Sequence, residues 1–200
     1  EQNLKITPRT GSVVGYDFGL QTFLKASDGR DILSPEFFKN SQNKIKSLNR
    51  SLSRKKKGSN NYKKAKRELL LAHLKIANQR RDFHFKTALR LAREYDVVYL
   101  EDLNIKAMQR LWGKKISDLG HGNFVNVLKH QCNKHGSLVF EIDRFYPSSK
   151  TCSACGSIKK DLSLRERSWT CGDCGANHDR DFNAAVNILR VGASALAGGV

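Results

Sequence analysis

Three acidic residues stand where regular structure is predicted to begin or end. Asp17 closes the apolar run that starts at Val13, Glu101 closes the run that starts at Val97, and Asp181 opens a final helical segment. Carboxylates near buried strand ends are unfavourable unless they are paired or bound to metal. Mg²⁺ prefers such oxygen ligands, and two ions together can activate water for phosphodiester cleavage. The three acids are therefore candidate catalytic magnesium ligands.

Each acid also has an ordinary structural interpretation. Asp17 could cap a turn, Glu101 could pair with a lysine, and Asp181 could be a helix N-cap. Asp102 and Asp179 are neighbours that could be the ligands instead. Because side chains alternate along a strand, Glu101 and Asp102 point to opposite sides, so only one of them can face the site.

Four of the five cysteines form two Cys-x-x-Cys pairs. Cys152 and Cys155 are separated from Cys171 and Cys174 by 15 residues, the spacing of a zinc ribbon. Four thiolates close a tetrahedral shell, so we expect one structural Zn²⁺ rather than a catalytic ion. Cys132 stands apart and is predicted to be a buried small hydrophobe. The charged and aromatic residues of this segment could also contact nucleic acid: Lys150, Lys159, Lys160, Arg165, Arg167 and Trp169. Trp169 could equally pack against the two Cys-x-x-Cys turns, the knuckles of the ribbon.

The formal net charge of +17 favours a polyanionic partner, and the charge is unevenly placed. Positions 39–95 hold 18 Lys and Arg but three acids. On two antiparallel helices these charges would track a phosphate backbone without reading bases. The other interpretation is a solvated helix face. The candidate nucleic-acid-binding residues are Arg54, Lys55, Lys56, Lys57, Arg80 and Arg81.

The elements that must position these residues follow from local patterns. Strands are predicted at Val13–Phe18, Thr22–Ala26 and Asp31–Leu33, and later at Val97–Glu101 and Leu138–Ile142. A helical region opens at Pro35 and Glu36 and breaks at Gly58–Asn60, and further helices run over 62–95, 124–135 and 181–191. The last helix places Phe182, Ala185, Val186 and Leu189 on one face. This order predicts a mixed α/β fold.

The domain organisation follows from the same elements. We expect a nuclease core over 1–148 that includes a basic helical hairpin at 36–95, an inserted zinc ribbon over 149–177, and a last core segment over 178–200. No segment has the length and apolarity of a transmembrane helix. The polar start of the chain lacks a signal-peptide core and an initiator Met, which predicts a fragment whose upstream part is missing. Paired cysteines outside a disulfide frame fit a reducing, prokaryotic-type cytoplasm.

Six segments, in order along the chain, resemble the C-terminal part of the TnpB family, which is encoded by insertion sequences and related to type V CRISPR effectors. The segments are Gly15–Leu20, Leu52–Ser59, Asn78–His84, Val98–Asn104, Phe145–Gly156 and His178–Asn187. The resemblance implies a RuvC-type, ribonuclease-H-like fold with an inserted zinc ribbon. It also implies an RNA-guided DNA endonuclease, monomeric on its guide RNA, that uses Mg²⁺ or Mn²⁺ at Asp17, Glu101 and Asp181.

The chain departs from the family in two places. The N-terminal part that reads the target-adjacent motif and helps hold the guide is absent, which puts autonomous target choice in doubt. Phe85 also differs from the residue expected after the histidine motif. Three other functions stay open: a nuclease-dead RNA-guided repressor, an RNA-independent resolvase and a zinc-ribbon interaction protein. The three intact acids argue against the nuclease-dead repressor and the zinc-ribbon interaction protein. The large basic hairpin argues against the resolvase.

Overall fold

A five-stranded mixed sheet forms the centre of the computed structural model, which describes residues 9–104, 110, 113, 116–163 and 165–198. The strands are β1 (Val13–Phe18), β2 (Thr22–Ala26), β3 (Ile32–Leu33), β4 (Val97–Glu101) and β5 (Leu138–Ile142). Their order is β3-β2-β1-β4-β5. β2 lies antiparallel to β1 and β3, whereas β1, β4 and β5 are parallel. The predicted mixed α/β class is confirmed.

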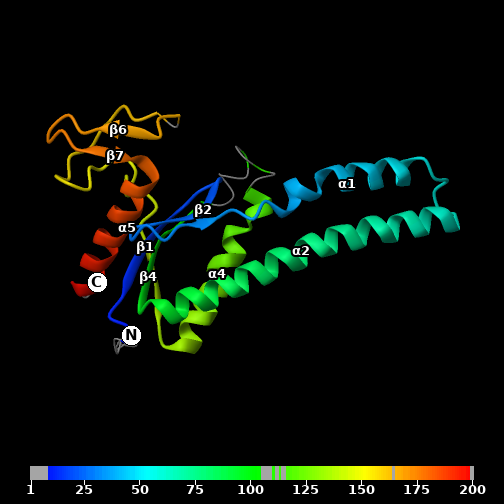
Figure 1. Cartoon of the computed structure of the whole chain (residues 1–200), viewed down its shortest axis with the longest axis horizontal. Helices are drawn as coiled ribbons and strands as arrows, with labels where there is room; N and C mark the ends of the chain where they lie inside the picture. The colour runs from blue at the N-terminus through cyan, green and yellow to red at the C-terminus, as the bar shows by residue number, and fades with distance from the viewer. Residues whose placement is uncertain (1–8, 105–109, 111–112, 114–115, 164, 199–200) are drawn as a thin grey trace.

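Helices cover both faces of this sheet (Figure 1). α5 (Arg180–Ala197) packs on one face, and α4 (His121–His135) with the end of α2 (Asn60–Glu94) packs on the other. Strand alternation decides which residue meets which helix. Val14 and Tyr16 belong to the same buried cluster as residues of α2 and α4, whereas Gly15 lies against α5. No helix in the described ranges is long and apolar enough to cross a membrane.

The basic hairpin projects away from the sheet (Figure 1). It consists of α1 (Phe37–Ser53) and the first half of α2. Ser59 is the N-cap of α2 and accepts a hydrogen bond from the Tyr62 backbone amide at 3.2 Å. The expected cap before α2 is thus confirmed, but α1 ends at Ser53, earlier than the break expected at Gly58. Arg54–Lys57 therefore form the tip of the hairpin instead of a helical face.

The buried face of α5 agrees in part with the one expected: Ala185 is buried and Leu189 packs against the core, but Phe182 does not. Phe182 is exposed, whereas Asn183 and Asn187 are each 1% exposed. The Asn187 Nδ2 donates to the backbone carbonyls of Ser148 at 2.9 Å and Thr151 at 2.6 Å. These amides hold the chain that leads into the cysteine segment, a role that an apolar periodicity does not reveal.

The cysteine segment forms a small module beside α5. Its strands β6 (Ser168–Thr170) and β7 (Asn177–Asp179) pair in antiparallel fashion, and β7 runs directly into α5. The predicted boundary between 177 and 178 falls inside β7. Trp169 is buried with Leu162, Cys152 and Cys171, so its ring packs against the knuckles.

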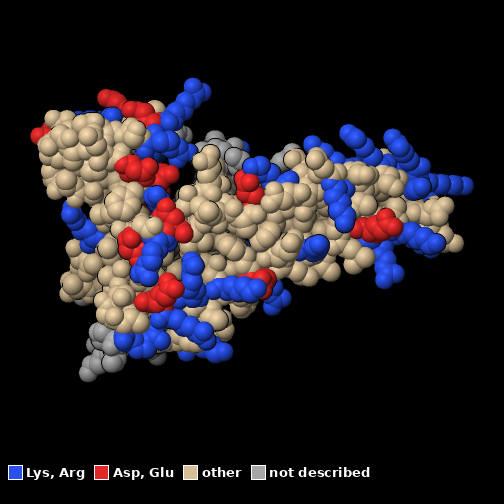
Figure 2. All heavy atoms as spheres, viewed as in Figure 1, with Lys and Arg blue, Asp and Glu red and all other residues tan. Residues whose placement is uncertain are grey.

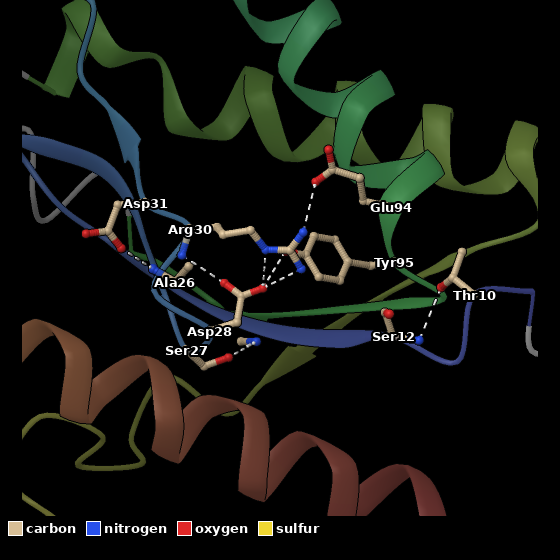
Figure 3. A network of polar contacts seen from close by, with 10 residues as sticks. Thr10, Ser12, Ala26, Ser27, Asp28, Arg30, Asp31, Glu94 and Tyr95 are labelled. Atoms are coloured by element: carbon tan, nitrogen blue, oxygen red, sulfur yellow. Dashed lines mark hydrogen bonds and ion pairs between the residues drawn. The ribbon is translucent and has the colours of Figure 1, made fainter.

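A polar network fixes the β2–β3 turn to the end of α2 (Figure 3). The Tyr95 hydroxyl donates to Asp28 at 2.6 Å, and the Arg30 guanidinium lies 5.0 Å from the Tyr95 ring centroid while pairing with Asp28 at 2.8 Å. On the neighbouring strand the Gly15 amide donates to Ser27 Oγ at 2.9 Å. The first hairpin, which carries Asp17, is thereby held in register with the helical layer.

Gly15→Ala is expected to lower the free energy of unfolding by about 3 kcal/mol or more, because overpacking against backbone cannot be relieved by a rotamer change. A Cβ at position 15 would lie 2.4 Å from the Ala185 carbonyl oxygen and 2.6 Å from the Leu189 nitrogen on α5. Denaturant unfolding measures the change. Gly172→Ala is the matched control, since its Cβ meets no atom within 4 Å. Equal stability of the two variants would contradict this close approach of β1 and α5.

Candidate active site and metal centre

Asp17, Glu101 and Asp181 line a single cleft of about 520 Å³. They come from the end of β1, the end of β4 and the first turn of α5. Tyr16 pairs with Leu100 across the parallel strands, so Asp17 and Glu101 occupy the next positions on neighbouring strands. Both lie on the α5 face of the sheet because Tyr16 and Leu100 point into the opposite core. The structure thus brings together acids that are far apart in the sequence.

The neighbouring acids have other partners. Asp179 is the N-cap of α5, and its Oδ1 accepts from the Phe182 amide at 2.8 Å. Asp102 accepts from Arg144 Nε at 2.9 Å and lines a different cleft. Asp181 is not the cap of its helix, and Asp102 does not line the cleft that Asp17, Glu101 and Asp181 share.

Burial, followed by the charges of neighbouring acids, raises the pKa values of the two strand-end acids. The pKa of Asp17 lies well above its usual value, first because of burial and then because of the charges of Asp181 and Glu101. Burial also raises the pKa of Glu101, although a hydrogen bond from Ser148 Oγ at 3.2 Å lowers it. A bound cation would relieve both costs, and carboxylate oxygens suit Mg²⁺. The residues present therefore fit a divalent-metal site.

The three carboxylates are not gathered as tightly as the ligands of one ion. Within the described ranges, the four cysteines are the one group of three or more His, Cys, Asp or Glu ligand atoms that all lie within 4.8 Å of one another. The acids are more widely spaced, which suits ligands shared between two ions better than a single closed shell.

Basic side chains line the same cleft. Arg167 Nη1 lies 3.2 Å from Asp181 Oδ2, and Lys150, Arg144 and Arg180 also contribute to the walls. Arg167 reaches the cleft because β6 folds back on β7, where the Arg180 amide donates to the Arg167 carbonyl at 2.8 Å. Sequence reasoning placed Arg167 only among the charges of the zinc segment. Arg167 directly precedes β6, and its place beside Asp181 depends on the pairing of β6 with β7, which the sequence did not show.

A second cleft of about 740 Å³ lies beyond Glu101, and Phe18 and Glu101 line both. His121 lines this second cleft, is 1% exposed, and has two ring nitrogens without a hydrogen-bond partner in the described chain. Burial lowers its pKa to about 4, so the ring is neutral. His84 nearby contacts the Leu119 carbonyl at 2.9 Å through Nε2. Both rings pack against Phe23 in the core, His84 stacked and His121 tilted. The sequence gave no sign of this burial, because the contacts join residues far apart in the chain.

The four cysteine sulfurs have the separation of a tetrahedral metal shell. Cys152 and Cys174 Sγ lie 3.7 Å apart, as do Cys155 and Cys171 Sγ. A tetrahedron with metal–sulfur bonds of about 2.3 Å has an edge of about 3.8 Å. All five cysteines are free of disulfides, and Cys132 is buried as expected. The cluster can hold one metal ion with no position left open.

Ser157 favours the thiolate form of two cysteines of the cluster. Ser157 Oγ lies 3.1 Å from Cys171 Sγ and 3.2 Å from Cys155 Sγ. Its hydrogen bond lowers the pKa of Cys171 to about 6. Hydrogen bonds with the other cysteines instead raise the pKa of Cys174 to about 12. Deprotonated thiols are the metal-binding species, so a metal ion that binds all four cysteines must displace the proton of Cys174.

The predicted nucleic-acid-binding residues occupy two different places. Arg54–Lys57 are exposed at the hairpin tip, and Figure 2 shows basic side chains projecting from that end of the molecule. Arg80 donates to the Ser117 carbonyl at 2.6 Å and so also has a structural role. Arg81 is exposed, with its guanidinium 5.6 Å from the Phe85 ring centroid.

Comparison with known proteins places the chain in a family. Residues 2–111 match the OrfB_IS605 family, described as "Probable transposase", and residues 121–188 match the "Cas12f1-like, TNB domain" family. A protein of Streptomyces pristinaespiralis named "Putative RNA-guided DNA endonuclease" is 38% identical over 201 residues, which cover 100% of this chain and 50% of that protein. "TnpB-like protein L79" of Acanthamoeba polyphaga mimivirus is 32% identical over 194 residues, covering 89% of this chain and 37% of the relative.

A solved structure shares the fold. The chain aligns with the cryo-EM structure of a Cas12f1–sgRNA–target DNA complex at a TM-score of 0.63 and 17% identity, over 92% of this chain and 50% of the other. The chain spans half or less of the length of the curated relatives compared above. The OrfB_IS605 match alone covers more than half of the chain. The chain therefore belongs to the OrfB_IS605 family of transposon-encoded proteins, the TnpB family.

Proposed function

We propose that this chain carries the nuclease centre of a divalent-metal-dependent DNA endonuclease of transposon origin. The observation that carries the proposal is the convergence of Asp17, Glu101 and Asp181 in one cleft with basic walls. Family membership and the names of the relatives support it. The strand arrangement, an antiparallel β1–β3 followed by the parallel strands β4 and β5, supports a ribonuclease-H-like fold of the RuvC type.

The protein residues have separable roles in this proposal. Asp17, Glu101 and Asp181 would hold Mg²⁺, or Mn²⁺ in its place, which supplies an activated water and neutralises charge at the leaving oxygen. Ser148 orients Glu101 through its hydrogen bond. Arg167 is held next to Asp181 and, with Arg180, would contact the phosphate being cleaved. Asp179 fixes the start of α5 and hence the place of Asp181.

The cysteine module serves as a structural zinc ribbon in this proposal. The sulfur geometry and the closed shell support a fixed Zn²⁺ with no catalytic position. The module contributes to the cleft through the arginine at position 167, so its folding is needed for the complete site.

Target choice is proposed to depend on a guide RNA in the full-length protein. The relatives' names support this, and so does the net charge of +17. In guided effectors, base pairing reads the sequence and the protein reads a short adjacent motif. The chain alone should therefore cut weakly, without sequence choice, and best on single strands.

Cleavage of single-stranded DNA with and without Mg²⁺ tests the proposed activity. Zinc-loaded protein should cut only when Mg²⁺ or Mn²⁺ is added, and the full-length protein with its co-purified RNA should cut matching duplex DNA. If the full-length, RNA-loaded protein cut no DNA with either ion, a nuclease-dead DNA-binding function would replace this one. Guide-programmed duplex cleavage by residues 1–200 alone would contradict the proposed need for further sequence.

Reversing Arg54, Lys55, Lys56 and Lys57 to Glu is expected to weaken single-stranded DNA binding more than tenfold for every sequence. It should also reduce the salt slope, which is the slope of the logarithm of the binding constant against the logarithm of the salt concentration, by about 3. Each lost phosphate contact removes about 0.7 of a released counterion. These side chains are exposed at the hairpin tip, and none of them forms an ion pair with a described residue. Affinity measured over a series of salt concentrations gives both quantities.

Lys134→Glu serves as the control because this exposed lysine stands at the end of α4, outside the hairpin. It should change the slope by less than one counterion. An unchanged slope in the fourfold variant would show that the tip is only a solvated surface.

A further inference from the structure

Phe145 stands exposed at the edge of the candidate active site. It lies in the segment that joins β5 to the zinc module and lines the cleft that holds the three acids. Its surface is 85% exposed, the largest value among the bulky hydrophobic residues described. Single exposed hydrophobic residues are ordinary on protein surfaces. Phe145 differs because its ring stands beside candidate catalytic groups in a polar, charged cleft.

The backbone that carries Phe145 is held firmly. The Phe145 amide donates to Asp143 Oδ1 at 2.8 Å, and the Tyr146 amide donates to the Asp143 carbonyl at 3.1 Å. Arg144 is tied to Asp102 at the end of β4. The Phe145 ring makes no aromatic or cation–π contact with any residue in the described ranges. A fixed turn therefore presents a ring that the protein itself does not use for packing.

The charges around the ring identify the kind of ligand. Arg144, Lys150, Arg167 and Arg180 line the same cleft. A groove that combines basic side chains with an exposed aromatic ring is the usual construction for binding single-stranded nucleic acid, because phosphates meet the cations and a base stacks on the ring. A base in a duplex is already stacked on both faces and paired, so it has no free face to offer.

We propose that Phe145 is a stacking platform for an unpaired base of the DNA strand in this cleft. The stack holds the strand so that a phosphate near that base faces Asp17, Glu101 and Asp181, and it selects single-stranded over duplex substrate. This inference rests on the proposed nuclease function and adds the side chain that gives the cleft its preference for single strands.

Fluorescence of 2-aminopurine tests the stack without requiring cleavage. A single-stranded 20-mer oligodeoxynucleotide carries one 2-aminopurine, moved along the strand in a series, and is titrated with zinc-loaded chain in the absence of Mg²⁺. The wild-type chain should quench the probe strongly at one or two positions. Phe145→Ala should lose that quenching and bind about 5- to 150-fold more weakly, the range for loss of one base–aromatic stack.

Two further variants separate stacking from general apolarity and from loss of folding. Phe145→Trp should restore both affinity and quenching, whereas Phe145→Leu should not, because it keeps apolar area but has no aromatic face. Leu33→Ala removes another exposed side chain, 73% exposed on β3 and outside the cleft, and should behave as wild type.

The outcomes distinguish this inference from the proposed function. Equal affinity and quenching for wild type and Phe145→Ala would overturn the stacking platform, even if the wild-type chain cuts DNA. Phe145-dependent quenching would uphold it even if Asp17 proved dispensable for cleavage, in which case the proposed function would fail. A wild-type chain that quenches the probe at no position would also overturn it.

Discussion

Asp17→Asn is expected to abolish Mg²⁺-dependent DNA cleavage, with a loss of about three orders of magnitude or more, because the change removes a charged ligand from the centre where negative charge develops. Glu101→Gln and Asp181→Asn should have similar effects. DNA binding should stay near the wild-type level, since the exposed hairpin tip lies on other elements. Single-turnover cleavage assays together with a separate binding assay measure the two properties.

The same variant should make the metal-free protein more stable. The pKa of Asp17 in the folded chain is raised by burial and by its acidic neighbours. The wild-type protein therefore loses folding free energy as the pH rises from the usual aspartate value through this raised pKa. Asp17→Asn cannot ionise, so its stability should not fall over that window, and at neutral pH without Mg²⁺ it should melt at a higher temperature than the wild type.

Asp179→Asn is the matched control for Asp181→Asn, because it makes the same charge change two positions away and asparagine still caps a helix. It should retain cleavage. If Asp179→Asn were inactive while Asp181→Asn cut normally, the third ligand would be misassigned. If all three acid variants cut DNA at the wild-type rate, a mechanism based on these carboxylates would have to be abandoned.

Removing the metal from the cysteine cluster is expected to unfold the module. Its buried core holds little beyond Leu162, Trp169 and two of the cysteines, which is too small to be stable alone. Structural zinc in small modules contributes about 10–16 kcal/mol of apparent binding free energy. Cys171→Ser should therefore lose bound zinc, which elemental analysis would measure as a fall from one ion per chain. Trp169, 5% exposed in the folded module, should report the unfolding by a red-shifted emission.

Cys132→Ala is the control for this loss, because Cys132 is buried in α4, outside the cysteine module. It should keep one zinc and the wild-type Trp emission. A metal-free protein with unchanged emission and unchanged thermal stability would rule out a structural metal in this module. Cleavage should fall with the zinc, since Arg167 reaches the active-site cleft only when β6 and β7 are paired.

The sequence predicted the elements whose residues repeat with a clear local period. All five strands of the sheet appear where apolar runs predicted them, β3 one residue shorter, and the Cys-x-x-Cys pairs meet as expected. α4 begins at His121, three residues before the expected start. Its N-cap is Gly120, in the left-handed conformation at φ 63°, which offers no polar side chain as a signal.

Features that depend on tertiary contacts were not predictable in the same way. The buried face of α5 includes Asn183 and Asn187, whose amides donate to carbonyls of a segment more than 30 residues away in the chain. The residues alone left both Asp179 and Asp181 open as ligands, and the resemblance implied Asp181, which stays a prediction. The position of Arg167 at the cleft depends on the pairing of β6 with β7, which local periodicity does not predict.

The cysteine module begins and ends at one place on α5. Asn183 Oδ1 accepts from the Ser153 amide at 2.9 Å at the beginning of the module, and β7 leads straight into the same helix at its end. A segment whose two ends are fixed within one helical turn behaves as an insertion. It can grow, shrink or be exchanged between those points at little entropic cost to the sheet. The length and sequence of the module can therefore change in evolution and in engineering, as long as Asn183 and Asn187 keep their carbonyl partners and the replacement still brings Arg167 to the cleft.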